Sequence, residues 1–242
     1  MNETAPISTN HRRRVAFYGG SFDPVHRGHL AIGFALLEQF KLDEFVFLPA
    51  FHAPHKKRNK PTSAYDRYAM LCLVTENEPH IAVSKMEIEM PERQYSVETL
   101  ATLNAELPDT DIFFVMGADS WMDITTWREW EKVLSMTNHI VVTRPGYFVT
   151  DEHVTDEIRS RIVDLRGVFN AKPQSGNDAK AETRPVGSVN FVNEHRIYLT
   201  NAVNFDISAT EIRQKIRDCD ASWHNDVPVE VANYIEKYQI YN

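Results

Sequence analysis

The chain has 242 residues, of which 43% are hydrophobic and 25% are charged, a composition typical of soluble globular proteins. Its formal net charge of −8 argues against a general nucleic-acid-binding surface, because such a surface needs an excess of basic residues. No apolar run is long enough to span a membrane, and the polar first ten residues lack the apolar core of a signal peptide. The two cysteines, Cys72 and Cys219, have no metal-binding spacing and are expected to stay reduced. We therefore expect a cytoplasmic protein that folds as a single domain over residues 1–242.

Short apolar runs and stretches of helical spacing alternate along the chain. The first apolar run, at 15–18, ends at two glycines and predicts a buried strand, and the spacing of apolar residues over 29–40 predicts a helix after it. The same alternation continues to the end of the sequence. Further strands are expected at 44–48, 81–83, 112–116, 140–143 and 197–199, and further helices at 63–76, 96–106, 127–134, 208–217 and 228–238.

This alternation predicts βαβ units and therefore an α/β fold, a Rossmann-like doubly wound parallel sheet with helices on both faces. Residues 149–193 interrupt the pattern with glycines, prolines and polar residues. We interpret them as an irregular insertion that is helical from about 151 to 165 and then forms a loop. In sheets of this kind ligands bind beyond the carboxyl ends of the strands, so motifs that follow strands are the candidates for a site.

The most specific motif follows the first predicted strand and opens the first predicted helix. It runs from Gly19 to His29 with the sequence GGSFDPVHRGH. Glycines permit close approach of a ligand to the backbone, and a helix N-terminus offers free N–H donors to phosphate. His26 and His29 add side-chain donors. The string contains neither GxGxxG nor GxxxxGK[ST], so it is neither a dinucleotide-binding fingerprint nor a P-loop.

A second motif, ISATEIR, runs from Ile207 to Arg213. It places the hydroxyls of Ser208 and Thr210 at a helix start, with Arg213 one turn later, where these groups can hold phosphate oxygens. Taken alone, hydroxyl residues at a helix start are more often only a helix cap.

The two motifs resemble the HxGH and ISSTxIR signatures of the nucleotidyltransferase superfamily. Five further strings are similar to those of bacterial nicotinate-nucleotide adenylyltransferases, enzymes that condense nicotinate mononucleotide with ATP to give deamido-NAD and pyrophosphate. The resemblance extends from about residue 15 to residue 241, apart from the insertion. The strings are PHK at 54–56, YSVETL at 95–100, MGADS at 116–120, TWREW at 126–130 and RPGY at 144–147.

The resemblance implies a role for each matching residue. The catalytic residues are expected to be His26, His29, Lys56 and Arg213. The expected ATP-binding residues are Gly19, Gly20, Ser21, Phe22, His26, His29, Gly117, Asp119, Ile207, Ser208, Thr210 and Arg213. The expected nicotinate mononucleotide-binding residues are Lys56, Ser96, Trp127 and Arg128, with Trp127 stacking on the pyridine ring. Mg²⁺ is the expected cofactor, carried by the ATP phosphates and not by protein ligands.

Each of these roles has a simpler structural alternative. Asp119 could cap the helix that follows it, and Lys56 could belong to a solvated basic loop. One of Trp127 and Trp130 is expected to pack in the core. Asp23 lies in the right loop for a metal ligand, but turn formation by Asp-Pro explains it equally well.

The sequence also departs from the family in places. Ser21 stands where threonine is commoner, Ala209 where serine is commoner and Ser96 where threonine is common, and the insertion at 149–193 is long for the family. The expected partners are the two small-molecule substrates, with no nucleic acid or membrane, and either a monomer or a homo-oligomer is compatible with the sequence.

Four other functions were weighed. They are a pantetheine-phosphate adenylyltransferase, a preference for nicotinamide mononucleotide, a non-catalytic nucleotide sensor, and an enzyme similar to aminoacyl-tRNA synthetases. The first family is usually shorter and lacks the PHK and tryptophan-containing strings. The retained histidine pair argues against a sensor, and the short acidic chain argues against a synthetase. The sequence decides poorly between the nicotinate and the nicotinamide mononucleotide.

Overall fold

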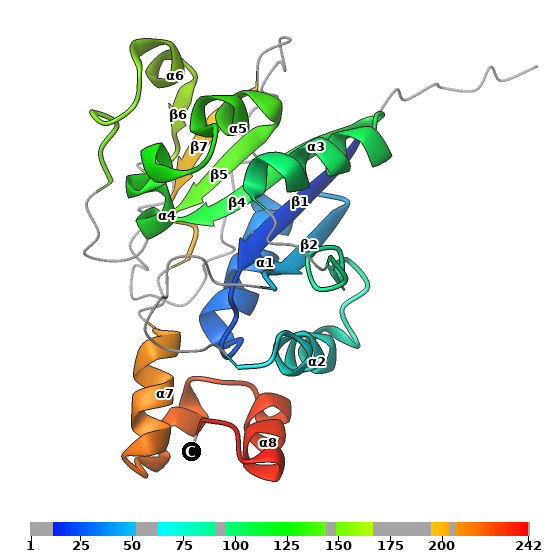
Figure 1. Ribbon diagram of the computed structural model, residues 1–242, viewed down its shortest axis with the longest axis vertical. Coiled ribbons are helices and arrows are strands. Elements are labelled where there is room, and N and C mark those ends of the chain that lie inside the picture. The colour runs from blue at the N-terminus through cyan, green and yellow to red at the C-terminus, as the bar shows by residue number, and fades with distance from the viewer. Residues whose placement is uncertain are drawn as a thin grey trace, which may run out of the picture.

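The computed structural model describes residues 12–51, 62–90, 95–143, 149–166, 195–203 and 207–241. These residues form a seven-stranded sheet in which every strand pairing is parallel, as the sequence predicted (Figure 1). The strand order is β3-β2-β1-β4-β5-β7-β6. The strands are β1 (Arg13–Gly20), β2 (Glu44–Pro49), β3 (Ile81–Val83), β4 (Thr110–Gly117), β5 (Asn138–Val142), β6 (Ile162–Asp164) and β7 (Ile197–Thr200).

Helices connect the strands and extend beyond them. The α-helices are α1 (Arg27–Gln39), α2 (Ala64–Thr75), α3 (Ser96–Glu106), α4 (Ala118–Met122), α5 (Trp130–Met136), α6 (Asp156–Ser160), α7 (Ala209–Arg217) and α8 (Val229–Tyr238). Two short 3₁₀ turns, η1 (Ile124–Thr126) and η2 (Ala221–Asn225), precede α5 and α8. Figure 1 shows α7 and α8 together at one end of the molecule, with α6 at the opposite end.

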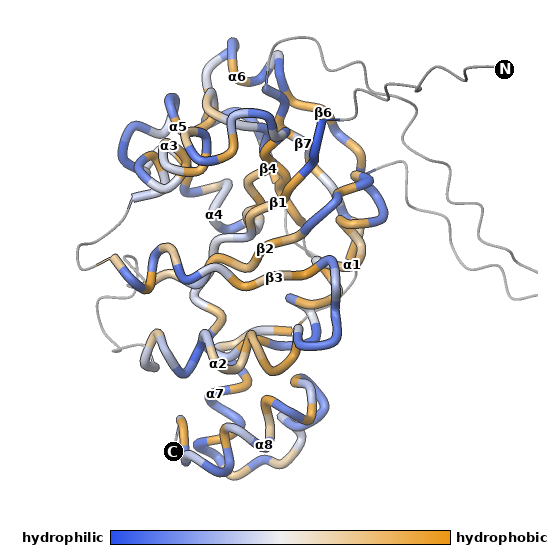
Figure 2. Tube along the Cα trace, turned by 90° about the vertical axis from the view of Figure 1, so that its right-hand side faces the viewer, coloured by the Kyte–Doolittle hydropathy of each residue, from blue (hydrophilic) through white to orange (hydrophobic). Residues whose placement is uncertain are grey.

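Alternate residues of the strands enter two separate hydrophobic clusters, one on each face of the sheet. Ala16 and Tyr18 of β1 belong to the first cluster, with residues of α1, α2, α7, η2 and α8. Val15 and Phe17 belong to the second, with residues of α3, α4, α5 and α6. Figure 2 shows the hydrophobic strands as an orange layer between the helices. The predicted cover of both faces is therefore confirmed.

The chain reverses its winding direction between β1 and β4. From β1 the sheet continues through β2 to β3 on one side, and from β4 through β5 to β7 on the other. The register pairs Gly20 with Pro49, Gly117 with Val142, and Val142 with Thr200, so that these strands end along one edge. Adjacent strands whose connections diverge leave a crevice at that edge, where ligands of open α/β sheets bind.

The prediction of a helix over 127–134 is wrong at its beginning. The segment first forms η1, and Trp127 then has an extended backbone (φ −76°, ψ 146°). Glu129 adopts a left-handed conformation (φ 51°), so a continuous helix is interrupted before Trp130, where α5 begins. The short helix α4 was not predicted.

The first part of the insertion at 149–193 differs from the helix predicted over about 151–165. Only Asp156–Ser160 is α-helical, and Ile162–Asp164 forms β6 in place of the expected helix. This strand pairs parallel with β7 and lies at the sheet edge. Arg161 is the C-cap residue of α6, and its buried side chain donates through Nη1 to the Leu134 carbonyl oxygen at 3.0 Å. Residues 167–194 lie outside the described part of the chain.

Candidate active site

The turn after β1 depends on Gly20. A Cβ atom at this position would lie 2.8 Å from Cζ of Phe22, so any side chain would collide with the ring. Phe22 is buried and has a left-handed backbone (φ 47°), and Ser21 between the two residues is half-buried. Gly20 thus lets Phe22 fold back over the turn. Gly19 makes a second close approach, with its Cβ position 3.1 Å from the ring of Phe114.

His26 and His29 form a stacked pair at the start of α1. Their ring centroids are 3.6 Å apart, and only 3% of His26 and 9% of His29 is exposed. The backbone N–H of His26 donates to Nδ1 of His29 at 3.2 Å. Because Nδ1 of His29 accepts this bond, the ring proton is on Nε2. His29 is therefore a neutral side chain that presents an N–H donor.

The helix α7 lies against this turn. Nη1 of Arg213 donates to the backbone carbonyl oxygen of Asp23 at 2.6 Å, across 190 residues of sequence. Nη2 donates to Oγ1 of Thr210 at 3.2 Å. Ser208 is the N-cap residue of α7, and both it and Ile207 are half-buried. The structure thus brings together the two motifs that the sequence singled out.

Arg67 was not predicted as part of the site. It belongs to α2, only 1% of it is exposed, and it donates to carbonyl oxygens of three segments. The acceptors are Ser21 at 2.5 Å, Ala50 at 2.6 Å, Phe51 at 3.4 Å and Thr62 at 3.1 Å. Burial lowers the pKa of the Arg67 guanidinium, and the negative charge of Asp23 opposes this effect. An arginine on the apolar face of a predicted helix, in line with Met70 and Leu71, was the signal in the sequence.

The end of β4 contributes Gly117 and Asp119. Asp119 is in the first turn of α4 and exposed, and its Oδ1 accepts from the backbone N–H of Ser120 at 2.9 Å. The N-cap residue of α4 is Gly117, and no side chain caps the helix, so Asp119 does not have the capping role given as the alternative. Asp119 lies at the same sheet edge as the β1 turn, since β1 and β4 are neighbours.

Two of the residues predicted to bind nicotinate mononucleotide, Ser96 and Arg128, lie around the start of α3. Ser96 is its first residue and is half-buried. Glu98 accepts from the backbone N–H of Tyr95 at 3.0 Å and from Nη1 of Arg128 at 3.1 Å. The Arg128 guanidinium also lies 5.0 Å from the centre of the Tyr95 ring. Ser96 and Arg128 are thus brought together through Glu98 and Tyr95.

Trp127 is half-buried and packs edge-on against Phe114, with 6.5 Å between ring centroids. Trp130 also packs against the second hydrophobic cluster. The fully buried tryptophan of this region is Trp121, whose indole N–H donates to the Thr150 carbonyl oxygen at 2.8 Å.

Two predicted segments fall outside the described residues. They are 52–61, which contains Lys56, and 144–148, which contains the whole RPGY string. Within the described ranges, no group of three or more His, Cys, Asp or Glu residues could hold a metal ion. No helix in the same ranges is long and apolar enough to cross a membrane.

Comparison with known proteins shows the family to which the chain belongs. Residues 17–215 match the family model described as cytidylyltransferase-like, so the chain is a nucleotidyltransferase by class. A protein of Corynebacterium jeikeium is 32% identical over 92% of this chain and 98% of its own length. One of Desulfatibacillum aliphaticivorans is 34% identical over 94% and 99%. Both are named probable nicotinate-nucleotide adenylyltransferase, and the chain belongs to the nicotinate-nucleotide adenylyltransferase family.

The fold also resembles a solved structure. Nicotinic acid mononucleotide adenylyltransferase of Plasmodium falciparum, complexed with NaAD, matches 95% of this chain and 97% of its own, with a TM-score of 0.63 and 20% identity. The resemblance of the sequence to this family and the predicted fold are both confirmed.

Proposed function

We propose that the protein transfers the adenylyl group of ATP to the phosphate of nicotinate mononucleotide, giving deamido-NAD and pyrophosphate. One observation carries this proposal beyond family membership. Arg213 of α7 is hydrogen-bonded to the turn that contains the stacked histidine pair, so both signature motifs line one phosphate-binding edge. Backbone N–H groups at the start of α1, a neutral imidazole donor and a guanidinium together suit a triphosphate.

The mononucleotide phosphate is the nucleophile. It is anionic at neutral pH, so the protein needs neither a covalent nucleophile nor a strong general base. One of its oxygens attacks the α-phosphorus of ATP in line. A new O–P bond forms as the bond from the α-phosphorus to the bridging oxygen breaks, and the electron pair of that bond leaves with pyrophosphate.

The turn and α7 stabilise the charge that moves onto pyrophosphate. We assign His29 to this role as a hydrogen-bond donor through Nε2, together with His26, Lys56 and Arg213. The remaining ATP contacts are assigned to the turn, the β4 end and the start of α7. These are Gly19, Gly20, Ser21, Phe22, Gly117, Asp119, Ile207, Ser208 and Thr210.

The start of α3 is assigned to the nicotinate carboxylate. The backbone N–H of Ser96 is in the first turn, where donors are not used within the helix and the helix dipole favours negative charge. Arg128 is paired with Glu98 beside it, so its charge is already partly balanced. We expect Trp127 to stack on the pyridine ring.

Magnesium is expected to arrive with ATP and to remain bound to its phosphates and water. The carboxylate of Asp23 is buried and accepts a hydrogen bond from Tyr241, so we assign it no metal. Cys72 and Cys219 are both free cysteines, and we propose that the protein acts in the cytoplasm.

The stereochemistry at phosphorus tests the reaction directly. The full chain is incubated with Mg²⁺, nicotinate mononucleotide and one diastereomer of adenosine 5′-O-(1-thiotriphosphate), and the dinucleotide product is analysed. A single in-line attack gives a thio analogue of deamido-NAD with inverted configuration. Retention would require an adenylyl-protein intermediate and would overturn the mechanism, whereas the absence of any dinucleotide would overturn the acceptor.

A further inference from the structure

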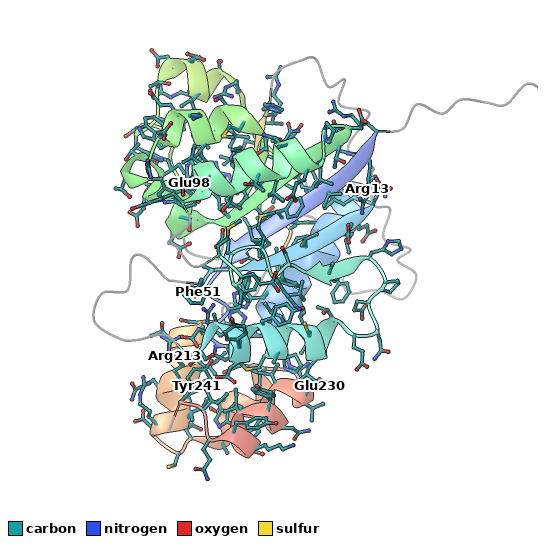
Figure 3. All side chains as sticks on the ribbon, turned by 45° about the vertical axis from the view of Figure 1, so that its right-hand side comes forward. Arg13, Phe51, Glu98, Arg213, Glu230 and Tyr241 are labelled. Atoms are coloured by element: carbon teal, nitrogen blue, oxygen red, sulfur yellow. The ribbon has the colours of Figure 1, made fainter. Side chains whose placement is uncertain are left out.

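The C-terminus of the chain returns to the phosphate-binding turn. Helix α8 ends at Tyr238, and the C-cap residue Gln239 has a left-handed backbone (φ 51°). Ile240 is then fixed by a hydrogen bond from its N–H to the Ile235 carbonyl oxygen at 3.1 Å. The hydroxyl of Tyr241 then donates to Oδ1 of Asp23 at 2.7 Å, across 218 residues of sequence. Figure 3 shows Tyr241 close to Arg213 at this end of the site.

Tyr241 supports a carboxylate that is costly to bury. Only 5% of Asp23 is exposed, so its charge depends on protein partners. Burial, followed by the charge of Asp23, raises the pKa of the Tyr241 hydroxyl, which favours the protonated form that donates to Asp23. The charge of Asp23 also opposes the effect of burial on Arg67. Removing the hydroxyl would leave one carboxylate oxygen without this donor in a buried site.

Three side chains from outside the turn fix adjacent groups within it. Arg67 of α2 donates to the carbonyl oxygen of Ser21, Arg213 of α7 to the carbonyl oxygen of Asp23, and Tyr241 to the Asp23 side chain. Donors that stabilise a transition state must be held to within about 0.5 Å, and they depend on such supporting hydrogen bonds. The turn between Gly20 and His26 is therefore held from three different elements.

We propose that Tyr241 is a positioning residue for adenylyl transfer. It touches no substrate, and it acts through Asp23 on the turn and on Arg213. The proposal rests on the proposed function of the turn as the triphosphate site. Tyr241 thus has a role in the reaction although it is far from both motifs in the sequence.

Two matched tyrosine variants test the proposal. Tyr241→Phe removes only the hydroxyl that contacts Asp23. Tyr234→Phe is the control, since the hydroxyl of Tyr234 on α8 donates to a different carboxylate, Oδ1 of Asp66, at 2.9 Å. Steady-state kinetics and denaturant unfolding are measured for both variants with the acceptor that supports pyrophosphate release, so the test remains valid if that acceptor is not nicotinate mononucleotide.

The expected result is a split between kcat and KM. A shift of the turn affects the transition state more than ground-state binding, so we expect Tyr241→Phe to lower kcat roughly tenfold with KM for ATP changed less than about twofold. Tyr234→Phe should keep kcat within about twofold even if both variants lose similar stability. Equal kcat in the two variants would overturn the proposal.

A double-mutant cycle tests the route through Asp23. If Tyr241 acts through this carboxylate, Tyr241→Phe should have no further effect on kcat in the Asp23→Ala background. The same fold-loss in both backgrounds would overturn the route. Should Asp23→Ala fail to fold, the comparison of the two tyrosine variants decides the proposal alone.

Discussion

Asparagine in place of His29 would separate the functions of the two ring nitrogens. Its Oδ1 can accept from the backbone N–H of His26 as Nδ1 does, whereas nothing replaces the donor at Nε2. We expect kcat to fall on the order of 100-fold, the usual cost of removing one donor to developing charge. The unfolding free energy should fall by about 1 kcal/mol. A folded variant with nearly normal kcat would remove His29 from the mechanism.

His139 provides a pH test that is independent of the site. It is fully buried at the start of β5, and burial lowers its pKa to about 3. The unfolded chain therefore binds a proton near pH 6.5 that the folded protein does not bind. Protonation therefore favours the unfolded chain once the pH falls below about 6.5. Between that pH and pH 3 the free energy of unfolding decreases by roughly 1 kcal/mol per pH unit.

The substitution His139→Phe keeps a ring at this position and removes the titration. Its neutral-pH stability should fall, because the Thr137 carbonyl oxygen loses the contact that it makes with Nδ1 at 3.0 Å. Between pH 6 and pH 4, however, its unfolding free energy should decline less steeply than that of the parent protein. Parallel pH curves from denaturant titrations would show that His139 does not control the acid limb.

Individual site residues differed in how far the sequence predicted them. His26, His29 and Arg213 were singled out because the motifs that contain them resemble the signatures of the family, although no pattern shows that Arg213 bonds to Asp23. The roles assigned to Lys56, Ser96, Trp127 and Arg128 stay predictions. Tyr241 could not be predicted, since its partner is 218 residues away in the sequence.

Among the elements, α2 connects the two residues that flank segment 52–61, because its Arg67 side chain donates to both. The side chain bonds Phe51 before the segment and Thr62 after it, as well as Ser21 in the turn. We expect Arg67→Lys to lose about 3 kcal/mol of unfolding free energy, because one ammonium group cannot reach acceptors that the planar guanidinium spans. We expect kcat of the Arg67→Lys variant to fall as well.

Denaturant unfolding and kinetics of Arg67→Lys check this expectation. Lys215→Met is a suitable control, because its side chain pairs with Asp226 between α7 and η2 at 2.7 Å but is one-third exposed. Pairs of that kind contribute at most about 1 kcal/mol. Similar losses in the two variants would contradict the role given to Arg67.

Elements were predictable where one periodicity dominates. The strands β1, β2 and β4 and the helices α1, α2 and α3 follow clear apolar patterns, and the sequence located them. Trp127 was placed wrongly in a helix, because the left-handed backbone of Glu129 has no signal in residue type. β6 was missed because a three-residue edge strand is determined by its pairing with β7, and not by local propensity.

For the whole molecule, the sheet order explains why distant motifs meet. The turn after β1 and the end of β4 are adjacent because these two strands are parallel neighbours, so both end at the same edge of the sheet. The rule that ligands bind at this edge predicts that the site forms here, and this location stays a prediction. The placement of α7 and of Tyr241 against the turn depends on long-range contacts, and it was not predictable from any one segment. That the chain forms one domain stays a prediction.

The measurement that tests the account most directly is pyrophosphate release by the purified full chain with ATP and Mg²⁺. Nicotinate mononucleotide, nicotinamide mononucleotide and phosphopantetheine are compared as acceptors. The account predicts that kcat/KM for nicotinate mononucleotide exceeds the other two by at least about tenfold, since Ser96 and Arg128 are assigned to its carboxylate. Faster release with either of the other acceptors, or no release with any of them, would contradict it.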